Sequence, residues 1–582
     1  MIVSFEYRDL FDDELPDINA LLANVPSRFI IGILATINDT LDIRKDTPDT
    51  QWFLLIHLTV NFQEAERARI LRLSQPLILQ GRKLFAHRFT VDLISKELLH
   101  FKGDDVQIEE NFAEDEYNLF KAYLANIHLL NLRDIEDMGP EIRNAADQGG
   151  DHLLRLMWPH LYKQYQFNNR PDAIKETCRG LALMTYIENH PVFGNFARAY
   201  YPTLGCNSPQ EYIHRLLGLA VPNLQRVPSD NPMDYFFRIR IDQSEPVLDS
   251  LVINPQAVQE NEELQLDYRA LKEKPLFQFD EGEFIVPYWD YLYNALNLGI
   301  LFSFYNDSGV NASVTDFGRF KGTIGKEFSE NILFKNMMIS CFSNKYDSLL
   351  FFDDNNSFNP DCYYRTGNNI FLIEFKDYLL NAEVIQSGSY EVIEQAIKEK
   401  FVELEVEEGW RTRIKPKGVS QIANNLNYLV GNQDRFWQID EKAARQRLKL
   451  RNMVIHPIII QTNIYFDFPA LNEYLDGTFQ PRVNNIRNSF RSIKPVTMIH
   501  FDYFFDKIVL FAKGNLKLSN EIDHYHTEML RRKKRAQRTL NENDWFQSYA
   551  PFSYVQSPDA SKYFYHRRDE ILAAIKQCWN IP

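Results

Sequence analysis

Apolar residues recur at intervals of three and four over most of the first 225 residues, which is the spacing that places them on one face of a helix. The segments "DINALLANV", "EYNLFKAYLANIHLLNL", "HLLRLMWPHLYKQY" and "PQEYIHRLLGLAV" follow this pattern. Ser208 before Pro209 adds a helix start signal, a serine cap followed by proline at the first helical position. One segment near residues 50–62, "TQWFLLIHLTVNF", is more strand-like. We therefore expect residues 1–225 to form a mainly helical region with a regulatory or recognition role.

Prolines at 222, 228 and 232, with polar residues between them, mark a linker or domain edge. After this edge, "YFFRIRID" and "PLFQFDEGEFIV" have the composition of strands joined by a turn, and a helical pattern follows them. The sequence predicts that residues 226–310 form a connecting α/β region.

The order of elements becomes more informative over residues 311–515. "TIGKEFSENILFKNMMISCF" has helical spacing, with Phe328, Ile332, Ile339 and Phe342 near one face. "YDSLLFFDD" is a strand that ends in the polar turn "NNSFN", and "PDCYYRT" and "IFLIEFKDYLL" form a hairpin around "GNN". A helix, "KGVSQIANNLNYLVGN", and a buried strand, "MVIHPIIIQTNIYF", come next. The predicted order is helix, three strands, helix, strand.

The strand "IFLIEFK" carries an acid and a base at its far end. Side chains alternate between the two faces of a strand, so Glu374 and Lys376 share one face, which we expect to emerge into a cleft. The turn folds Asp361 back toward the rim of the same sheet. Two neighbouring carboxylates repel each other, and a hard divalent cation such as Mg²⁺ removes that repulsion. With Lys376 to orient or polarise a water molecule, this set is sufficient for phosphodiester hydrolysis.

Pro360-Asp361, followed thirteen residues after that acid by Glu374-x-Lys376, resembles the motif of the PD-(D/E)xK nuclease superfamily. The resemblance covers residues 311–510. It implies a restriction-endonuclease-like α/β core, a mixed sheet flanked by helices, within an α+β multidomain chain. It also implies that Asp361 and Glu374 are metal ligands, that Lys376 is the catalytic lysine, and that Mg²⁺ is the cofactor, with Mn²⁺ as a substitute.

Members of this superfamily commonly add a glutamate from the preceding helix and a glutamine from the following one. Glu330 in "FSENIL" fits the glutamate position best, as a catalytic residue and third metal ligand, with Glu327 one turn earlier as its rival. Gln421, with Tyr428 on the same helix, fits the glutamine position.

The resemblance implies a metal-dependent endonuclease that cleaves DNA, or alternatively RNA. Large bacterial proteins with a regulatory front and such a nuclease often act in antiviral defence, which is the biological role we expect here. A protein partner or self-association would then use the N-terminal region. The alternative is an inactive nuclease-fold scaffold, which binds nucleic acid or a partner protein without the metal.

The formal net charge of −15 argues against a passive nucleic-acid coat, because such proteins gain affinity by neutralising phosphates. It does not argue against a nuclease, whose metal site is itself anionic. Positive charge is concentrated in "KAARQRLKLR" (442–451) and "RRKKRAQR" (531–538), and we expect residues 516–582 to form a basic helical tail.

Other sequence features bear on the compartment and on competing sites. The five cysteines form no CxxC pair, the start of the chain is acidic, and no apolar run approaches the roughly 18 residues of a membrane helix. We therefore expect a cytoplasmic protein without a membrane partner. His524, His526 and Glu528 in "DHYHTE" could ligate a metal, although solvated side chains beside a basic run are the favoured interpretation.

Overall fold

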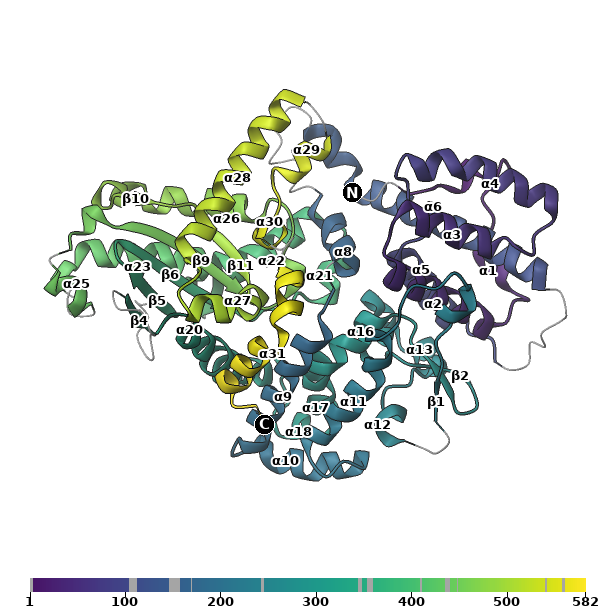
Figure 1. The fold of residues 1–582 in the computed structure, drawn as a ribbon, viewed down its shortest axis with the longest axis horizontal. Helices are drawn as coiled ribbons and strands as arrows, with labels where there is room; N and C mark the ends of the chain where they lie inside the picture. Colours follow the sequence, from purple (N-terminus) through teal and green to yellow (C-terminus); the bar gives the residue numbers. More distant parts are fainter. Residues whose placement is uncertain are drawn as a thin grey trace. The chain divides into compact units, whose positions relative to one another are not determined.

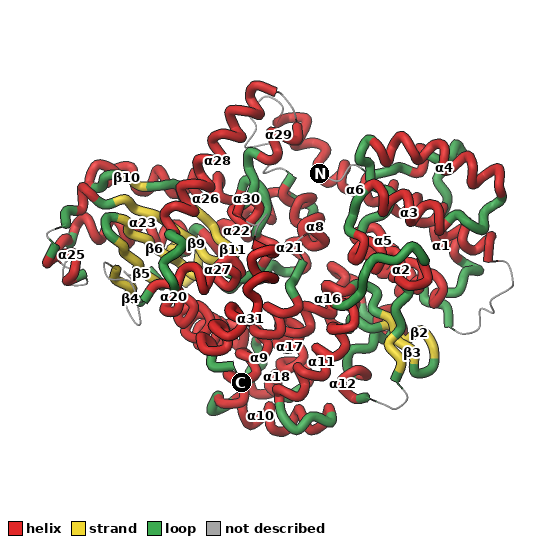
Figure 2. Tube along the Cα trace, in the orientation of Figure 1, coloured by secondary structure: helices red, strands yellow, loops and turns green. Residues whose placement is uncertain are grey.

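The computed structural model describes residues 4–581, apart from 104–111, 146–156, 169, 242–244, 344–347, 353–359, 409–410, 435–439, 447, 540–541 and 557–559. The fold is α+β, as expected: helices make up most of the secondary structure, and the strands form small sheets between them (Figure 2). Two compact units make up the chain, Met1–Gly139 with Arg170–Thr315 and Pro140–Asn169 with Asp316–Pro582. Among the described residues, no helix combines the length and apolar character needed to cross a lipid bilayer.

The first unit is mostly helical (Figure 1). Its helices are α1 (Ile18–Leu22), α2 (Ser27–Arg44), α3 (Pro48–Leu58), α4 (Glu64–Leu79), α5 (His87–Leu99), the first part of α6 (Phe112–Ala145), α9 (Ala173–Asn189), α10 (Phe193–Tyr200), α11 (Pro209–Leu224), α12 (Pro246–Asp249), α13 (Pro255–Glu260), α14 (Glu262–Gln265), α15 (Arg269–Glu273), α16 (Trp289–Asn294), α17 (Ile300–Asp307) and α18 (Val310–Ser313). The serine cap predicted for α11 is confirmed, because Ser208 Oγ accepts a hydrogen bond from the backbone N–H of Glu211 at 3.2 Å.

The strand-like interpretation of residues 50–62 is wrong, because most of this segment lies in α3. Thr47 caps the helix by accepting a hydrogen bond from the backbone N–H of Thr50, and Pro48 occupies the first helical position. These start signals decide the local structure more strongly than the apolar run that follows them.

The strands expected in residues 226–310 are present. β1 (Ile239–Arg240), β2 (Phe277–Asp280) and β3 (Glu283–Ile285) form an antiparallel sheet in the order β1-β3-β2. Helix α16 follows this sheet, as the apolar pattern predicts.

The second unit holds a mixed sheet between helices. Its strands are β4 (Ser348–Phe351), β5 (Cys362–Thr366), β6 (Asn369–Lys376), β9 (Val454–Gln461), β10 (Ser492–Ile493) and β11 (Thr497–His500). The order is β10-β9-β6-β5-β4, and β11 also pairs with β9. β4, β5 and β6 are antiparallel to one another, whereas β6, β9 and β11 run parallel. The predicted hairpin around "GNN" is confirmed, while the polar turn expected at 355–359 lies outside the described residues.

Helices of the second unit precede, interrupt and follow these strands. They are α8 (Trp158–Asn168), α19 (Phe317–Ile324), the π-helix η6 (Gly325–Phe334), α20 (Lys335–Phe342), α21 (Ala382–Gln386), α22 (Tyr390–Phe401), α23 (Gly418–Gly431), α25 (Glu441–Arg445), α26 (Leu471–Val483), α27 (Asp502–Ala512), α28 (Leu518–Thr539), α29 (Glu542–Gln547), α30 (Phe552–Gln556) and α31 (Ala560–Trp579). A separate two-stranded hairpin, β7 (Glu403–Glu408) with β8 (Arg411–Pro416), connects α22 to α23. The sequence pattern did not lead us to expect this hairpin.

Aromatic stacking covers one face of the mixed sheet. Phe371 of β6 stacks on Tyr364 of β5 with ring centroids 5.2 Å apart, and Tyr364 stacks on Phe342 of α20 at 4.4 Å. Phe375 stacks on Phe334 of η6 at 4.7 Å. The alternate residues of β6, including Glu374 and Lys376, therefore lie on the opposite face, against which α23 packs.

The π-helix shifts the buried face of the helix that leads into the sheet. Phe328 and Phe342 are buried, as the predicted face requires, but Ile339 is exposed and Ile332 is only half-buried, so the prediction is wrong for these two residues. Leu333, five residues after Phe328, is buried in place of Ile332, as the wider turn of a π-helix requires.

Candidate active site

The hairpin of β5 and β6 brings Asp361 to the end of β6. Cys362 pairs with Ile373 across the two strands, and Asp361 comes one residue before Cys362. Its carboxylate Oδ2 accepts a hydrogen bond from the backbone N–H of Phe375 at 2.8 Å. This bond holds the carboxylate at the strand end that the sequence pattern predicted.

Lys376 lies between two carboxylates. Its Nζ is 2.9 Å from Glu374 Oε2 and 3.5 Å from Asp361 Oδ2. The expectation that Glu374 and Lys376 emerge into a cleft is wrong, because Glu374 is 0% exposed and Lys376 only 7%. Asp361, whose side chain is 22% exposed, is the member of this trio that solvent reaches most easily.

Burial and the neighbouring charges control protonation in this trio. Burial, followed by the charge of Asp361, raises the pKa of Glu374 to about 8, although Lys376 opposes the shift. Burial alone would lower the pKa of Lys376, but the charges of Glu374 and then Asp361 outweigh it and raise that pKa. Above that pKa of Glu374, with all three groups ionised, the trio carries one excess negative charge, which favours an additional cation. At neutral pH Glu374 mostly keeps its proton, which a cation bound to this carboxyl group would displace.

Two buried acceptor atoms, one on β6 and one on α23, lack hydrogen-bond partners among the described residues. They are Glu374 Oε1 and Gln421 Oε1, and Gln421 belongs to helix α23, which packs on β6. A buried carboxylate oxygen without a partner is costly, and buried polar groups of this kind are normally satisfied by water, a proton or an ion. Tyr428 lies almost two turns further along α23 and is half-buried.

The structure distinguishes the two glutamates of η6. Glu330 is half-buried, and its pKa is raised by burial and by the charge of Asp361, so its carboxylate faces the same region. It forms an ion pair with Lys326, however, and does not join the other two carboxylates. Glu327 is exposed. Glu330 is therefore the glutamate that the fold places near Asp361.

Two further residues, which sequence reasoning missed, lie at this end of the sheet. Asp377 follows Lys376 and accepts hydrogen bonds from Ser329 Oγ of η6 at 2.7 Å and from Thr462 Oγ1 at 2.6 Å. Gln461 ends β9 beside Lys376, and neither amide atom of its side chain has a partner among the described residues. Both follow buried apolar strands, and this was the signal available in the sequence.

The two carboxylates of the trio can hold Mg²⁺ only if the protein supplies few of the metal's ligands. Within the part of the chain that the structure describes, no three His, Cys, Asp or Glu side chains converge to hold a metal. Mg²⁺ is usually held by one or two carboxylates, with waters and substrate phosphate completing its coordination. Asp361 and Glu374 meet that requirement, and the unpartnered Glu374 Oε1 supplies a free acceptor.

The residues of "DHYHTE" do not converge. His526 Nε2 lies 2.9 Å from Thr497 Oγ1 of β11, so this histidine packs against the sheet. The expectation that it is solvated is therefore wrong. His524 is exposed, and Glu528 forms ion pairs with Arg531 and Arg532. This segment is therefore not a candidate metal site.

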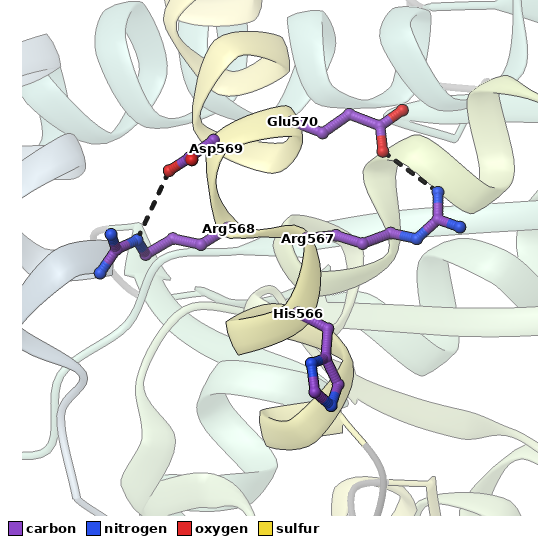
Figure 3. A pocket seen from close by; sticks show the side chains of 5 residues that line it. All are labelled: His566, Arg567, Arg568, Asp569 and Glu570. Atoms are coloured by element: carbon purple, nitrogen blue, oxygen red, sulfur yellow. Dashed lines mark hydrogen bonds and ion pairs between the residues drawn. The ribbon is translucent and has the colours of Figure 1, made fainter.

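A hollow of about 510 Å³ on α31 is lined by the consecutive residues 566–570 (Figure 3). Within it, Arg567 pairs with Glu570 at 3.1 Å and Arg568 with Asp569 at 3.7 Å, so its charges compensate one another locally. All five residues are exposed, and five successive residues of one helix do not enclose a ligand. We therefore place the candidate site at the end of β6, where buried charge and unpartnered acceptors coincide.

Comparisons with protein-family models, with curated proteins and with solved structures find no match to this chain.

Proposed function

We propose that this protein is a metal-dependent nuclease that hydrolyses phosphodiester bonds of DNA, with RNA as the alternative substrate. The observation that carries the proposal is the contact of Asp361 and Glu374 with the single ammonium of Lys376. The resemblance of Pro360-Asp361 and Glu374-x-Lys376 to the PD-(D/E)xK motif supports it. A role in bacterial defence against foreign nucleic acid is supported by that resemblance alone.

Each member of the trio has a distinct chemical role in this proposal. Asp361 and Glu374 would hold Mg²⁺ or Mn²⁺, which supplies Lewis acidity at the phosphate and lowers the pKa of water when bound. The backbone N–H of Phe375 fixes the orientation of Asp361. Lys376 orients the attacking water and stabilises negative charge that develops on the phosphate oxygens. Gln421 and Glu330 would contact the water or substrate from the flanking helices.

One observation favours a second function, an inactive scaffold with the same fold. Lys376 already compensates much of the carboxylate charge, and no three-ligand group forms among the described residues. A scaffold would retain this buried ion pair for stability and would bind nucleic acid or a partner without a metal.

Calorimetric titration with Mn²⁺ separates the two functions. Under the nuclease proposal, the wild-type chain binds Mn²⁺ and Glu374→Gln loses that binding, whereas the control variant Glu399→Gln, at a half-buried position of α22, retains it. Asp361→Ala and Lys376→Ala should each reduce kcat/KM for DNA cleavage by about a hundredfold or more. No binding at millimolar Mn²⁺ supports the scaffold, and cleavage that is unchanged in both variants rejects the proposed site.

A further inference from the structure

The hairpin of β7 and β8 separates its charges between two faces. Its strands are antiparallel, with Val406 opposite Arg413 and Leu404 opposite Lys415. Arg413 and Lys415 are exposed and, because side chains alternate along a strand, they share one face. Lys417 continues the same alternation beyond the end of β8. We call the row Arg413, Lys415 and Lys417 the basic face of the hairpin.

The other face of the hairpin is acidic. Glu405 and Glu407 are exposed and lie opposite Ile414 and Thr412. Neither carboxylate therefore faces a cation directly across the hairpin. Opposite charges lie directly across from each other only in the last pair of the register, Glu408 with Arg411, and the other charges of the two strands are separated between the faces. This separation favours an interaction with a polyanion on one side only.

The basic face leads to the candidate active site. Burial lowers the pKa of Lys417, and the charges of Lys376 and Lys415 lower it further. Glu374 and Asp361 act on the same ammonium in the opposite direction. Lys417 is therefore within electrostatic reach of Lys415 of the hairpin and of the trio at the end of β6.

The junction that directs the hairpin is tightly packed. The backbone N–H of Lys417 donates a hydrogen bond to Val402 O at 2.9 Å. Gly418, at a φ of +28°, begins α23 so close to Phe401 that a Cβ there would lie 2.5 Å from the Phe401 carbonyl oxygen. The same Cβ would lie 3.2 Å from Ile459 Cδ1, and Ile459 is the register partner of Glu374, so the hairpin ends beside the part of β9 that pairs with Glu374.

We propose that the basic face of the β7–β8 hairpin binds the phosphate backbone of duplex DNA and leads it to Asp361, Glu374 and Lys376. This inference deepens the proposed nuclease function and rests on it for the cleavage step alone. A two-stranded ribbon fits the major groove of B-DNA, whereas the major groove of duplex RNA is too narrow and deep. Because the whole chain carries a net charge of −15, local cations must supply the attraction to DNA.

Fluorescence anisotropy with a short labelled DNA duplex, in EDTA to prevent cleavage, tests the binding. The full-length variant Arg413→Gln/Lys415→Gln should bind roughly tenfold more weakly than wild type at moderate salt. Its plot of log K against log salt should be shallower by about two, since two phosphate contacts are lost. Glu405→Gln/Glu407→Gln on the acidic face should bind at least as tightly as wild type, and the charge-retaining Arg413→Lys/Lys415→Arg should bind much as wild type does.

The binding proposal is overturned if Arg413→Gln/Lys415→Gln binds duplex DNA with wild-type affinity and salt dependence. Equal binding of duplex RNA, with the same loss in this variant, would overturn the assignment to DNA. Cleavage assays then separate this proposal from the proposed function. If Asp361→Ala still cleaves but the hairpin variant loses DNA binding, the active-site assignment fails and the hairpin proposal stands.

Discussion

Lys376 Nζ lies 2.9 Å from Glu374 Oε2, and both side chains are almost fully shielded from solvent. Removing one partner of a buried ion pair leaves an uncompensated charge, which costs far more than the intact pair contributes. The stability of the fold therefore depends on both partners being present, in addition to their candidate catalytic role.

We predict that, above the pKa of about 8 at which Glu374 ionises, Lys376→Met destabilises the protein by about 3–5 kcal/mol, because Glu374 and Asp361 then share no cation. Adding Glu374→Gln to this variant should recover part of the loss, since one buried charge disappears. Urea denaturation of the three variants gives the coupling energy directly. Mn²⁺ should stabilise Lys376→Met more than wild type, because the metal replaces the missing ammonium. A loss in the double variant equal to the sum of the losses in Lys376→Met and Glu374→Gln would show that the pair is not coupled.

Asp377 is predicted to act as a positioning residue for η6. It accepts hydrogen bonds from Ser329 and Thr462 and pairs with Lys321. Burial alone would raise its pKa, but these three partners together outweigh burial and lower it. Asp377→Asn should cost about 2 kcal/mol of stability and, because η6 carries Glu330, lower kcat while KM and Mn²⁺ affinity stay within about twofold. Ser329→Ala, which loses a single hydrogen bond, should cost only about 1 kcal/mol. A parallel loss of Mn²⁺ affinity in Asp377→Asn would show that this residue acts on the metal site itself.

Alternation along β6 and the "GNN" turn were sufficient to predict that Asp361, Glu374 and Lys376 meet. Strand periodicity is strictly two, so the shared face of Glu374 and Lys376 follows from spacing alone. Their burial does not follow from spacing. It depends on the packing of α23 on β6. Gly418, at the start of α23, lies so close to the carbonyl oxygen of Phe401, at the end of the preceding helix, that there is no room for a side chain.

Three other features could not be predicted from the sequence, each for a physical reason. A π-helix inserts an extra residue per turn, so the buried face of residues 325–342 drifts away from a helical spacing of 3.6. The β7–β8 hairpin alternates charged residues with apolar ones on exposed strands, so it lacks the buried apolar run by which we recognised β6 and β9. Gln461 became visible as a neighbour of Lys376 only through the parallel register of β6 and β9.

Gly418→Ala should destabilise the protein by about 1–3 kcal/mol and alter the hairpin junction. The new Cβ would meet the Phe401 carbonyl oxygen at 2.5 Å and the Ile459 Cδ1 at 3.2 Å, at a φ of +28° that non-glycine residues rarely adopt. Gly431→Ala, at the other end of α23, is the matched control because nothing lies within 4 Å of its added Cβ. This control should be neutral or stabilising by up to about 1 kcal/mol. If both variants unfold at the same urea concentration, the junction is not tight.

Asp467 should make stability fall as pH rises through the mildly acidic range. Burial raises its pKa from 3.8 to about 6, and Ser553, which donates a hydrogen bond to it, offsets only part of that shift. Between these values the folded state keeps a proton that the unfolded state has lost, so the free energy of unfolding decreases with rising pH. Above the folded pKa the full penalty, about 3 kcal/mol, remains.

Asp467→Asn should therefore be more stable than wild type by about 1–3 kcal/mol at neutral pH and similar to it at pH ~4. Asp569→Asn, whose wild-type carboxylate is almost fully exposed, is the matched control and should follow the wild-type profile. Urea denaturation across this pH range measures all three proteins, and a constant difference between Asp467→Asn and wild type would contradict the assigned titration.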